Sequence, residues 1–154
     1  MEYYIALALC VVAAAFEGLC AGHDPMAQLK ATRQPRWSPP QWLWVLVALA
    51  WYGICFTALI RLLPLWPEAR TAIVLLGAMM LLNGAVNLLQ FRLKRLDLAF
   101  FSLLPYWLLL AAFLIAACPL DRLTCALFAG YAVYLLYAGA WQFRLWRMNR
   151  ALMG

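Results

Sequence analysis

Charge is what this sequence has least of. Charged residues make up 12% of the 154 residues, and 68% of the residues are hydrophobic. An average soluble domain is about a quarter charged and about half apolar. The composition therefore excludes an ordinary soluble domain and is typical of a chain embedded in a lipid bilayer.

Metal-ligating residues are also sparse. The chain has a single histidine, His23. Its five cysteines are scattered and form no CxxC pair: Cys10, Cys20, Cys55, Cys118 and Cys125. An odd number of scattered cysteines predicts neither a disulfide framework nor a zinc site, and a metal centre needs ligands that converge. We therefore expect no metal and no certain cofactor, and we place His23 at the membrane interface.

Catalytic patterns are missing as well. We find no nucleophile beside a base, no paired carboxylates and no glycine-rich phosphate loop. Ser102 has no histidine near it in sequence, and Asp97 follows Arg95 in a basic turn where the two should pair. These patterns leave open whether the protein is an enzyme, although they favour a protein that is not one.

Long apolar runs are what the sequence has in abundance. Five runs are almost free of charge and long enough to cross a bilayer, because about 20 helical residues rise about 30 Å. A helix also satisfies its own backbone hydrogen bonds in lipid. We predict an all-α integral membrane protein, a five-transmembrane-helix bundle forming one domain over residues 1–154. The expected spans are 3–22, 41–60, 71–91, 98–118 and 123–143, with one long loop at 23–40.

The first span is not expected to be a signal peptide. Its head carries Glu2 where a signal peptide has basic residues, and its apolar run is too long for an h-region. We therefore expect Met1 onward to be retained.

The basic residues divide unevenly between the two faces of this bundle. Three belong to the face that follows the second and fourth spans: Arg61, Arg70 and Arg122. The other face, which holds the C-terminus, has nine: Lys30, Arg33, Arg36, Arg92, Lys94, Arg95, Arg144, Arg147 and Arg150. The positive-inside rule then predicts an outside N-terminus and a cytoplasmic C-terminus. We attribute the net charge of +6 to this topology and to anionic membrane lipid, and we expect no nucleic-acid partner.

Proline and tryptophan crowd the approach to the second span. Pro39 and Pro40 suit an extended lead-in and the first turn of a helix, where the missing N–H is not needed. Trp42 and Trp44 lie at interfacial depth, where indoles commonly anchor a helix. Trp37 lies outside the span on a proline-stiffened loop. It either anchors there or folds over the mouth of the bundle as a lid.

The third span carries a stripe of amides. Asn83, Asn87 and Gln90 recur at spacings of four and three residues, which places them within about 60° of one another on a helix. Amides inside a membrane must face protein or a cavity. They either hydrogen-bond a neighbouring helix or contact a bound molecule.

The fifth span carries a stripe of aromatic rings. Tyr131, Tyr134, Tyr137 and Trp141 recur every three or four residues and share one side of the helix. The stripe serves either packing or ligand contact. Tyrosine hydroxyls in a membrane need partners, and we expect the amides of the third span to supply them.

One acid stands well inside a span. A carboxylate in hydrocarbon is costly, so we expect Glu17 near an interface, paired with a cation, or protonated. Gly18 and Gly22 follow it as a GxxxG pair, and Gly77 and Gly84 give the third span a similar smooth strip. Such strips let helices approach closely, either within one chain or in a homodimer.

A set of motifs accompanies the five spans. Residues 35–42 read Pro-x-Trp-x-Pro-Pro-x-Trp and stand in the long first loop. The third span has Asn83, Asn87 and Phe91, and the last helix ends in Leu-Trp-Arg-x-Asn at 145–149. Together these features resemble the TspO/translocator protein family, the tryptophan-rich sensory proteins. The resemblance extends from the first loop to the end of the chain.

The chain departs from this family pattern at several positions. Ala48 stands where the family's GPVW segment has a tryptophan, and Ser102 replaces an acid in the fourth span. In the fifth span Gly130 replaces a proline, Tyr134 a tryptophan and Gln142 an asparagine. The cholesterol-recognition pattern of the last helix is incomplete. These changes bear on the identity of the ligand more than on the fold.

The resemblance implies a pocket within the bundle, open toward the first loop, for a flat hydrophobic ligand such as a porphyrin, haem or a sterol. Basic residues of the loop, Lys30, Arg33 and Arg36, would meet ligand carboxylates at the rim. The candidate ligand-binding residues are Trp37, Trp44, Tyr52, Asn83, Asn87, Trp107, Tyr131, Tyr134, Tyr137, Ala138 and Gln142.

Three functions remain open at this stage. The leading one is a TspO-like receptor or carrier for such a ligand. The second is a small membrane enzyme acting on an apolar substrate, by porphyrin breakdown or isoprenoid conversion. The third is an interaction subunit whose amide and glycine stripes bind another membrane protein.

Overall fold

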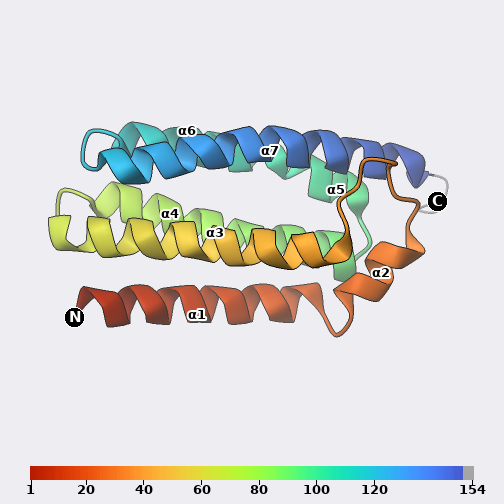
Figure 1. The fold of residues 1–154 in the computed structure, drawn as a ribbon, viewed down its shortest axis with the longest axis horizontal. Coiled ribbons are helices and arrows are strands. Elements are labelled where there is room, and N and C mark those ends of the chain that lie inside the picture. Colours follow the sequence, from red (N-terminus) through yellow and green to blue (C-terminus); the bar gives the residue numbers. More distant parts are fainter. Residues whose placement is uncertain (151–154) are drawn as a thin grey trace.

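The structure, a computed structural model, describes residues 1–150 and consists of helices that run the length of a bundle (Figure 1). Five helical segments are long and apolar enough to cross a membrane. They are α1 (Glu2–Ala21), α3 (Gln41–Leu62) continued by η1 (Leu63–Leu65), α4 (Arg70–Asn87) continued by η2 (Leu88–Arg92), α5 (Leu96–Phe101) with α6 (Leu103–Ala117), and α7 (Arg122–Met148). The predicted all-α, five-helix membrane bundle is confirmed.

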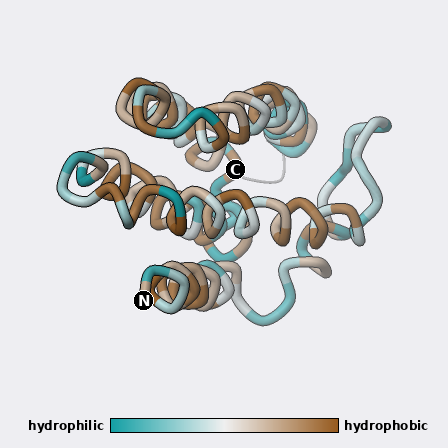
Figure 2. The backbone as a smooth tube through the Cα atoms, turned by 60° about the vertical axis from the view of Figure 1, so that its left-hand side comes forward, coloured by the Kyte–Doolittle hydropathy of each residue, from teal (hydrophilic) through white to brown (hydrophobic). Residues whose placement is uncertain are grey.

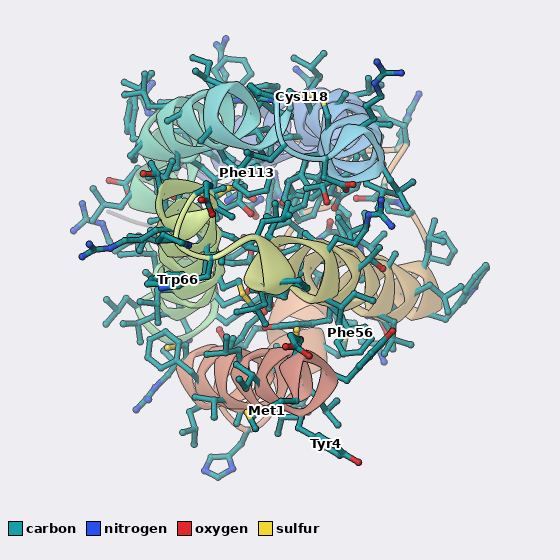
Figure 3. The ribbon with its side chains drawn as sticks, turned by 90° about the vertical axis from the view of Figure 1, so that its left-hand side faces the viewer. Met1, Tyr4, Phe56, Trp66, Phe113 and Cys118 are labelled. Atoms are coloured by element: carbon teal, nitrogen blue, oxygen red, sulfur yellow. A yellow bond between two sulfur atoms is a disulfide. The ribbon has the colours of Figure 1, made fainter. Side chains whose placement is uncertain are left out.

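The helices lie in three rows. In Figure 1, α6 and α7 form the upper row, α3 and α4 the middle row, and α1 lies alone beneath them. The view along the bundle in Figure 3 shows the same rows end-on. Helix α1 packs on α3 and α4, while α4 packs on α6 and α3 packs on α7. The N-terminus and the end of α7 lie at opposite ends, as an odd number of spans requires.

Hydrophobic side chains cover both the inside and the outside of this bundle. Phe113 lies fully buried between the rows, whereas Tyr4 on α1 points away from the bundle and is 80% exposed (Figure 3). Large apolar residues are similarly exposed on other helices, with Ile115 of α6 at 77% and Val133 of α7 at 69%. The hydrophilic colouring in Figure 2 concentrates at the turns and in the long loop. An apolar outer surface of this extent suits lipid as the surrounding solvent.

The long first loop contains a short helix that the sequence analysis did not predict. Helix α2 (Pro25–Ala31) starts with proline in its first turn, where no N–H is needed. The Asp24 side chain caps it by accepting a hydrogen bond from the N–H of Ala27 at 2.8 Å. Gly22, with φ of 85°, ends α1 and turns the chain toward α2. In the sequence, Asp24 followed by Pro25 was the signal that could have predicted the start of this helix.

The fourth span is broken near its start. Pro105 has no N–H to donate to the carbonyl of Phe101, so the helix cannot run regularly through this turn. Helix α5 therefore ends at Phe101 and α6 begins at Leu103, with Ser102 between them. The turn before α5 is held by Arg95, which donates to Asp97 at 2.8 and 3.0 Å, and this confirms the predicted pair.

The prediction that the cysteines form no disulfide was wrong. Cys118 follows the end of α6 and Cys125 lies in the first turn of α7, and the two are joined by a disulfide. The tight antiparallel turn between these helices brings their Cα atoms to 4.7 Å, although an odd total suggested no pairing. Cys10, Cys20 and Cys55 are free and buried.

Candidate ligand pocket

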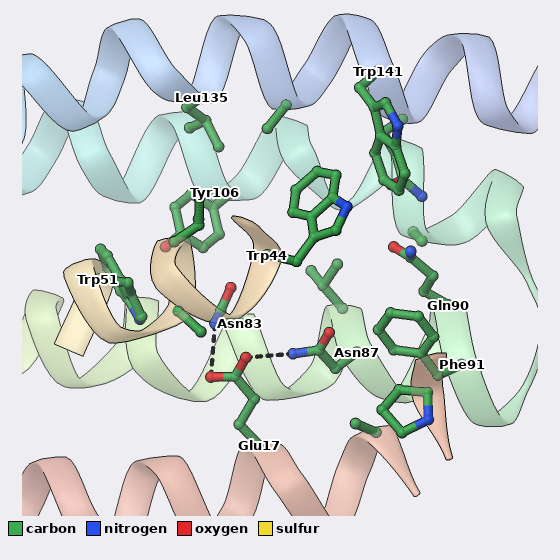
Figure 4. A pocket seen from close by; sticks show the side chains of 18 of the residues that line it. Glu17, Trp44, Trp51, Asn83, Asn87, Gln90, Phe91, Tyr106, Leu135 and Trp141 are labelled. Atoms are coloured by element: carbon green, nitrogen blue, oxygen red, sulfur yellow. Dashed lines mark hydrogen bonds between the residues drawn. The ribbon is translucent and has the colours of Figure 1, made fainter. Parts of the chain in front are cut away.

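A cavity of about 440 Å³ lies inside the half of the bundle that adjoins α2 (Figure 4). Residues of all five spans and of α2 line it. Small-molecule sites in proteins commonly measure about 300–1,000 Å³ and are mostly apolar with a few placed polar groups. The volume and the enclosure by every span make this cavity the candidate functional site.

Aromatic rings form the wall of the cavity on the side of α7. Trp51 and Tyr131 face each other with centroids 4.5 Å apart, and the hydroxyls of Tyr131 and Tyr106 are 2.9 Å apart. Closer to α2, Trp44 and Trp141 pack with centroids 4.7 Å apart. Ring pairs of this kind are rigid and present flat faces. The wall therefore suits a flat, apolar guest.

A carboxylate occupies the opposite wall. Glu17 on α1 accepts hydrogen bonds at Oε2 from the Tyr52 hydroxyl at 2.6 Å and from Asn83 Nδ2 at 2.9 Å. Its Oε1 accepts from Asn87 Nδ2 at 2.6 Å (Figure 4). The two asparagines are one helical turn apart on α4, so both amides reach the same acid. Three neutral donors on two helices thus hold one charged side chain of α1 in the cavity wall.

A glycine sets the distance between α1 and α4. The ring of Phe16 lies over Gly84, so close that a Cβ at that position would be 2.6 Å from Phe16 Cε1. Glu17 follows Phe16 directly, and Gly84 follows Asn83. The close approach at Gly84 therefore brings the carboxylate within hydrogen-bonding distance of the amides. The sequence analysis expected such a smooth strip on this helix.

Two N–H donors in the cavity wall have no partner. Trp51 Nε1 and Gln142 Nε2 are buried without a hydrogen bond among the residues that the structure describes, and each residue is only 5% exposed. Leaving a buried donor unpaired costs about 1–3 kcal/mol. A bound molecule with an oxygen or nitrogen acceptor would remove that cost, so these two groups are candidate ligand contacts.

The end of the third span departs from α-helical geometry. Residues Leu88–Arg92 form a turn of π-helix, η2, in which Gln90 and Phe91 line the cavity. A π-turn adds a residue to the turn and changes the direction of the side chains beyond it, and such turns are frequent at functional sites. Gln90 lines the same cavity as Asn83 and Asn87, as the predicted stripe requires, but among the described residues only the two asparagines donate to Glu17.

The structure brings most of the predicted site residues together at this cavity. Eight of them line it: Trp44, Tyr52, Asn83, Asn87, Tyr131, Tyr134, Ala138 and Gln142. Trp37, Trp107 and Tyr137 do not. Trp107 packs against the core instead, and its neighbour Tyr106 faces the cavity. The expected pairing of tyrosine hydroxyls with the third-span amides was wrong, because those amides bind Glu17 and Tyr131 pairs with Tyr106.

The cap of the cavity is α2 rather than Trp37. Pro25, Met26 and Leu29 line the cavity from α2. Trp37 is 46% exposed and packs edge-on against Tyr137, with centroids 5.5 Å apart. Its loop is fastened to α7, since the Tyr137 hydroxyl donates to the Trp37 carbonyl at 3.2 Å and the Trp141 indole donates to Ser38 Oγ.

Four lining residues that matter chemically were outside the predicted ligand-binding set: Glu17, Trp51, Tyr106 and Trp141. Trp141 had been named in the aromatic stripe, with packing or ligand contact left open. The signal for Glu17 was present, because an acid in an apolar span and two amides one turn apart on another span are natural partners. Trp51 and Tyr106 gave no comparable signal, since an aromatic residue in a span is usually a packing residue.

Five helices that are long and apolar enough to cross a membrane, with a cavity between them, define a small integral membrane protein. The sequence matches the TspO/MBR family over residues 6–147, and the chain belongs to that family. It is also similar to Protein CrtK of Rhodobacter capsulatus, with 30% identity over 139 aligned residues that cover 84% of this chain and 86% of the relative.

Proposed function

We propose that this TspO-family protein is a membrane receptor or carrier that binds a flat hydrophobic ligand in the cavity of its bundle. The observation that carries the proposal is the cavity of about 440 Å³ between the ring wall of α3, α6 and α7 and the polar wall of α1 and α4. Porphyrins, haem and sterol-like molecules have the flat apolar shape that such a wall accommodates.

The ring pairs Trp51–Tyr131 and Trp44–Trp141 would stack on the faces of such a ligand. The unpaired N–H groups of Trp51 and Gln142 would orient it through an acceptor atom. Carboxylates of a porphyrin would lie at the rim, where Lys30, at the end of α2, is exposed to solvent. Lys30, Arg33 and Arg36 do not line the cavity itself.

The orientation in the membrane is part of this proposal. The cavity adjoins α2, and α2 belongs to the face with nine of the 12 basic residues, which the positive-inside rule places in the cytoplasm. The disulfide Cys118–Cys125 lies at the other end, and disulfides persist in oxidising compartments. A membrane-impermeant maleimide should label Glu68→Cys but not Arg36→Cys in intact cells, and the reverse result would invert the orientation.

Titration with protoporphyrin tests the binding function. The purified protein in lipid nanodiscs should give a saturable change in porphyrin fluorescence anisotropy. Ala138→Phe places a ring in the cavity and should weaken binding about tenfold or more, equivalent to about 1.4 kcal/mol. Leu136→Phe is the matched control, because Leu136 lies on the same helix, is 64% exposed and should leave binding unchanged.

Two outcomes would contradict the proposal. One is a linear, unsaturable signal in all three proteins, which would indicate partition into lipid. The other is equal saturation in Ala138→Phe and the wild type, which would place the ligand outside the cavity. Mass spectrometry of the recovered porphyrin separates binding from catalysis, since a new product mass would show that the protein is an enzyme.

A further inference from the structure

Among residues 1–150, Glu17 is a carboxyl group without a counter-ion in the first membrane-spanning helix, α1. Among residues 1–150, no lysine, arginine or histidine nitrogen lies within 4.0 Å of its carboxylate, and its three partners are two amides and a hydroxyl. We propose that the cavity selects ligands that carry a protonated amine, and that this ammonium pairs with Glu17. The inference rests on the proposed binding of flat hydrophobic molecules and goes beyond it, because among such molecules it favours those with an ammonium group over the porphyrins, haem and sterols considered above.

Every hydrogen bond of the Glu17 carboxyl group is one that it accepts. The Tyr52 hydroxyl and Asn83 Nδ2 donate to Oε2, and Asn87 Nδ2 donates to Oε1. A carboxylate has about four lone-pair sites, whereas a protonated acid must itself donate one hydrogen bond. Three donors therefore leave about one acceptor site, on Oε1, for a further donor such as an ammonium group.

Neutral donors do not cancel the charge. An ionised side chain in the hydrocarbon region costs several kcal/mol unless it pairs with an opposite charge, and removing one partner of a buried pair is costly for the same reason. Arg92, at the end of η2, donates to the Leu19 carbonyl of α1 at 3.5 Å and forms no ion pair with Glu17. It therefore does not neutralise Glu17, and the missing positive charge is left to come from the ligand.

The rest of the cavity wall agrees with a cation. Its 26 lining residues include one acid, Glu17, and no lysine, arginine or histidine. The other titratable groups that face the cavity are tyrosines: Tyr52, Tyr106, Tyr131 and Tyr134. Aromatic faces attract cations, and this attraction grows when the site is desolvated. An anionic group placed beside Glu17 would meet repulsion and no compensating base.

A matched set of ligands tests the proposal. Each member has the same flat tricyclic aromatic core with one tail, which is dimethylaminopropyl, its uncharged isohexyl isostere, or carboxypropyl. Affinities for wild type and Glu17→Gln are measured at pH 7 in phosphatidylcholine nanodiscs, corrected for partition into protein-free discs. Glutamine keeps the size and an acceptor oxygen of Glu17 while removing its charge.

We expect wild type to bind the amine about tenfold or more tightly than the isohexyl compound, a difference of about 1.4 kcal/mol, and the carboxylate most weakly. Glu17→Gln should lose this preference. Its folding is checked separately by thermal unfolding without ligand, because the glutamine NH2 must face at least one of the three groups that donate to Glu17.

Three results would overturn the inference: equal affinity of wild type for the amine and the isohexyl compound, a preference for the carboxylate, or an amine preference that Glu17→Gln retains. If Glu17→Gln does not fold, the comparison of the three tails on wild type decides alone. Failure of the proposed function looks different, because then no member of the set binds saturably, whereas failure of this inference leaves the isohexyl compound bound.

Discussion

The side-chain amide of Asn149 binds the backbone of Arg33 in both directions. Asn149 Oδ1 accepts from the Arg33 N–H at 2.9 Å, and Nδ2 donates to the Arg33 carbonyl at 3.0 Å. Asn149 is 1% exposed although it stands at the end of α7, 116 residues from its partner. The pair fastens the loop after α2 to the last helix and so holds the cap of the cavity in place.

Asn149→Ala should release this loop. It removes both hydrogen bonds to the Arg33 backbone, together with the one from Nδ2 to the Leu145 carbonyl, and each such bond typically contributes about 0.5–1.5 kcal/mol. Hydrogen exchange of residues 32–40 should accelerate markedly, while exchange in α4 and α6 stays unchanged. Arg150→Ala, a change in the adjacent exposed residue, is the control. Equal protection of the loop in both variants would show that Asn149 does not hold it.

Gly84→Ala should push α1 away from α4. The new Cβ would meet Phe16 at 2.6 Å, so the ring or the helix must move, and overpacking of this kind costs about 1–3 kcal/mol. Thermal unfolding in detergent should show a lowered Tm. Gly77→Ala is a matched control on the same helix, because a Cβ there meets nothing within 4 Å. It should be neutral or slightly stabilising, as alanine favours a helix over glycine.

A lowered Tm in both glycine variants would mean that general helix perturbation, and not contact with Phe16, is being measured. In that case the double variant Phe16→Ala/Gly84→Ala, which removes the clashing ring, would have a Tm no higher than that of Gly84→Ala.

Gln142→Leu should stabilise the ligand-free protein. The Nε2 group of Gln142 is buried without a partner, and leucine of similar size removes the unpaired donor, which costs about 1–3 kcal/mol. The Tm without ligand should rise, while the affinity for a flat ligand with a carbonyl acceptor should fall. A variant that is less stable than wild type in the absence of ligand would show that the amide has a structural role.

The ion pair between Arg61 and Asp121, at the end of the bundle opposite the cavity, should make the stability of the protein depend on pH in the acid range. Arg61 donates to both carboxylate oxygens of Asp121, and this holds the pKa of Asp121 well below its usual range, with the N–H of Thr124 adding to the effect. Because the folded pKa is depressed, the contribution is complete above the unfolded pKa of about 3.9 and is lost as the pH falls toward the folded value.

The matching variant is Asp121→Asn, which keeps an N-cap for α7 but removes the charge. Its Tm should lie below that of wild type at pH 6, and the difference should shrink between about pH 4 and pH 2. A difference that stays constant over this interval would show that the pairing with Arg61 contributes nothing to stability.

Features that depend on a single helix or turn could be predicted from the sequence. Span positions follow from hydropathy, and the pairing of Arg95 with Asp97 follows from their closeness in the chain. The partner of Asn83 and Asn87 could not be predicted, because helical periodicity tells which residues share a face but not which helix that face meets. Glu17 meets them since Gly84 lets α1 approach.

Local deviations limited the remaining predictions. The π-turn η2 replaces α-helical geometry from Leu88 to Arg92, and no sequence period reports such a turn. The disulfide escaped prediction because counting cysteines over the whole chain ignores the turn that brings two of them together. Helix α2 was missed since its seven residues lie below the length at which a periodic pattern can be read.

The turn between α6 and α7 is covalently stapled by Cys118 and Cys125, and Asp121 between them is tied to the end of α3 by Arg61. The cavity lies at the opposite end, where hydrogen bonds, ring contacts and the apolar packing of Leu29 hold α2 and the loop to α3 in place. A covalent link therefore closes one end of the bundle, whereas noncovalent contacts close the other. Separation of the helices at the cavity end would leave the disulfide intact.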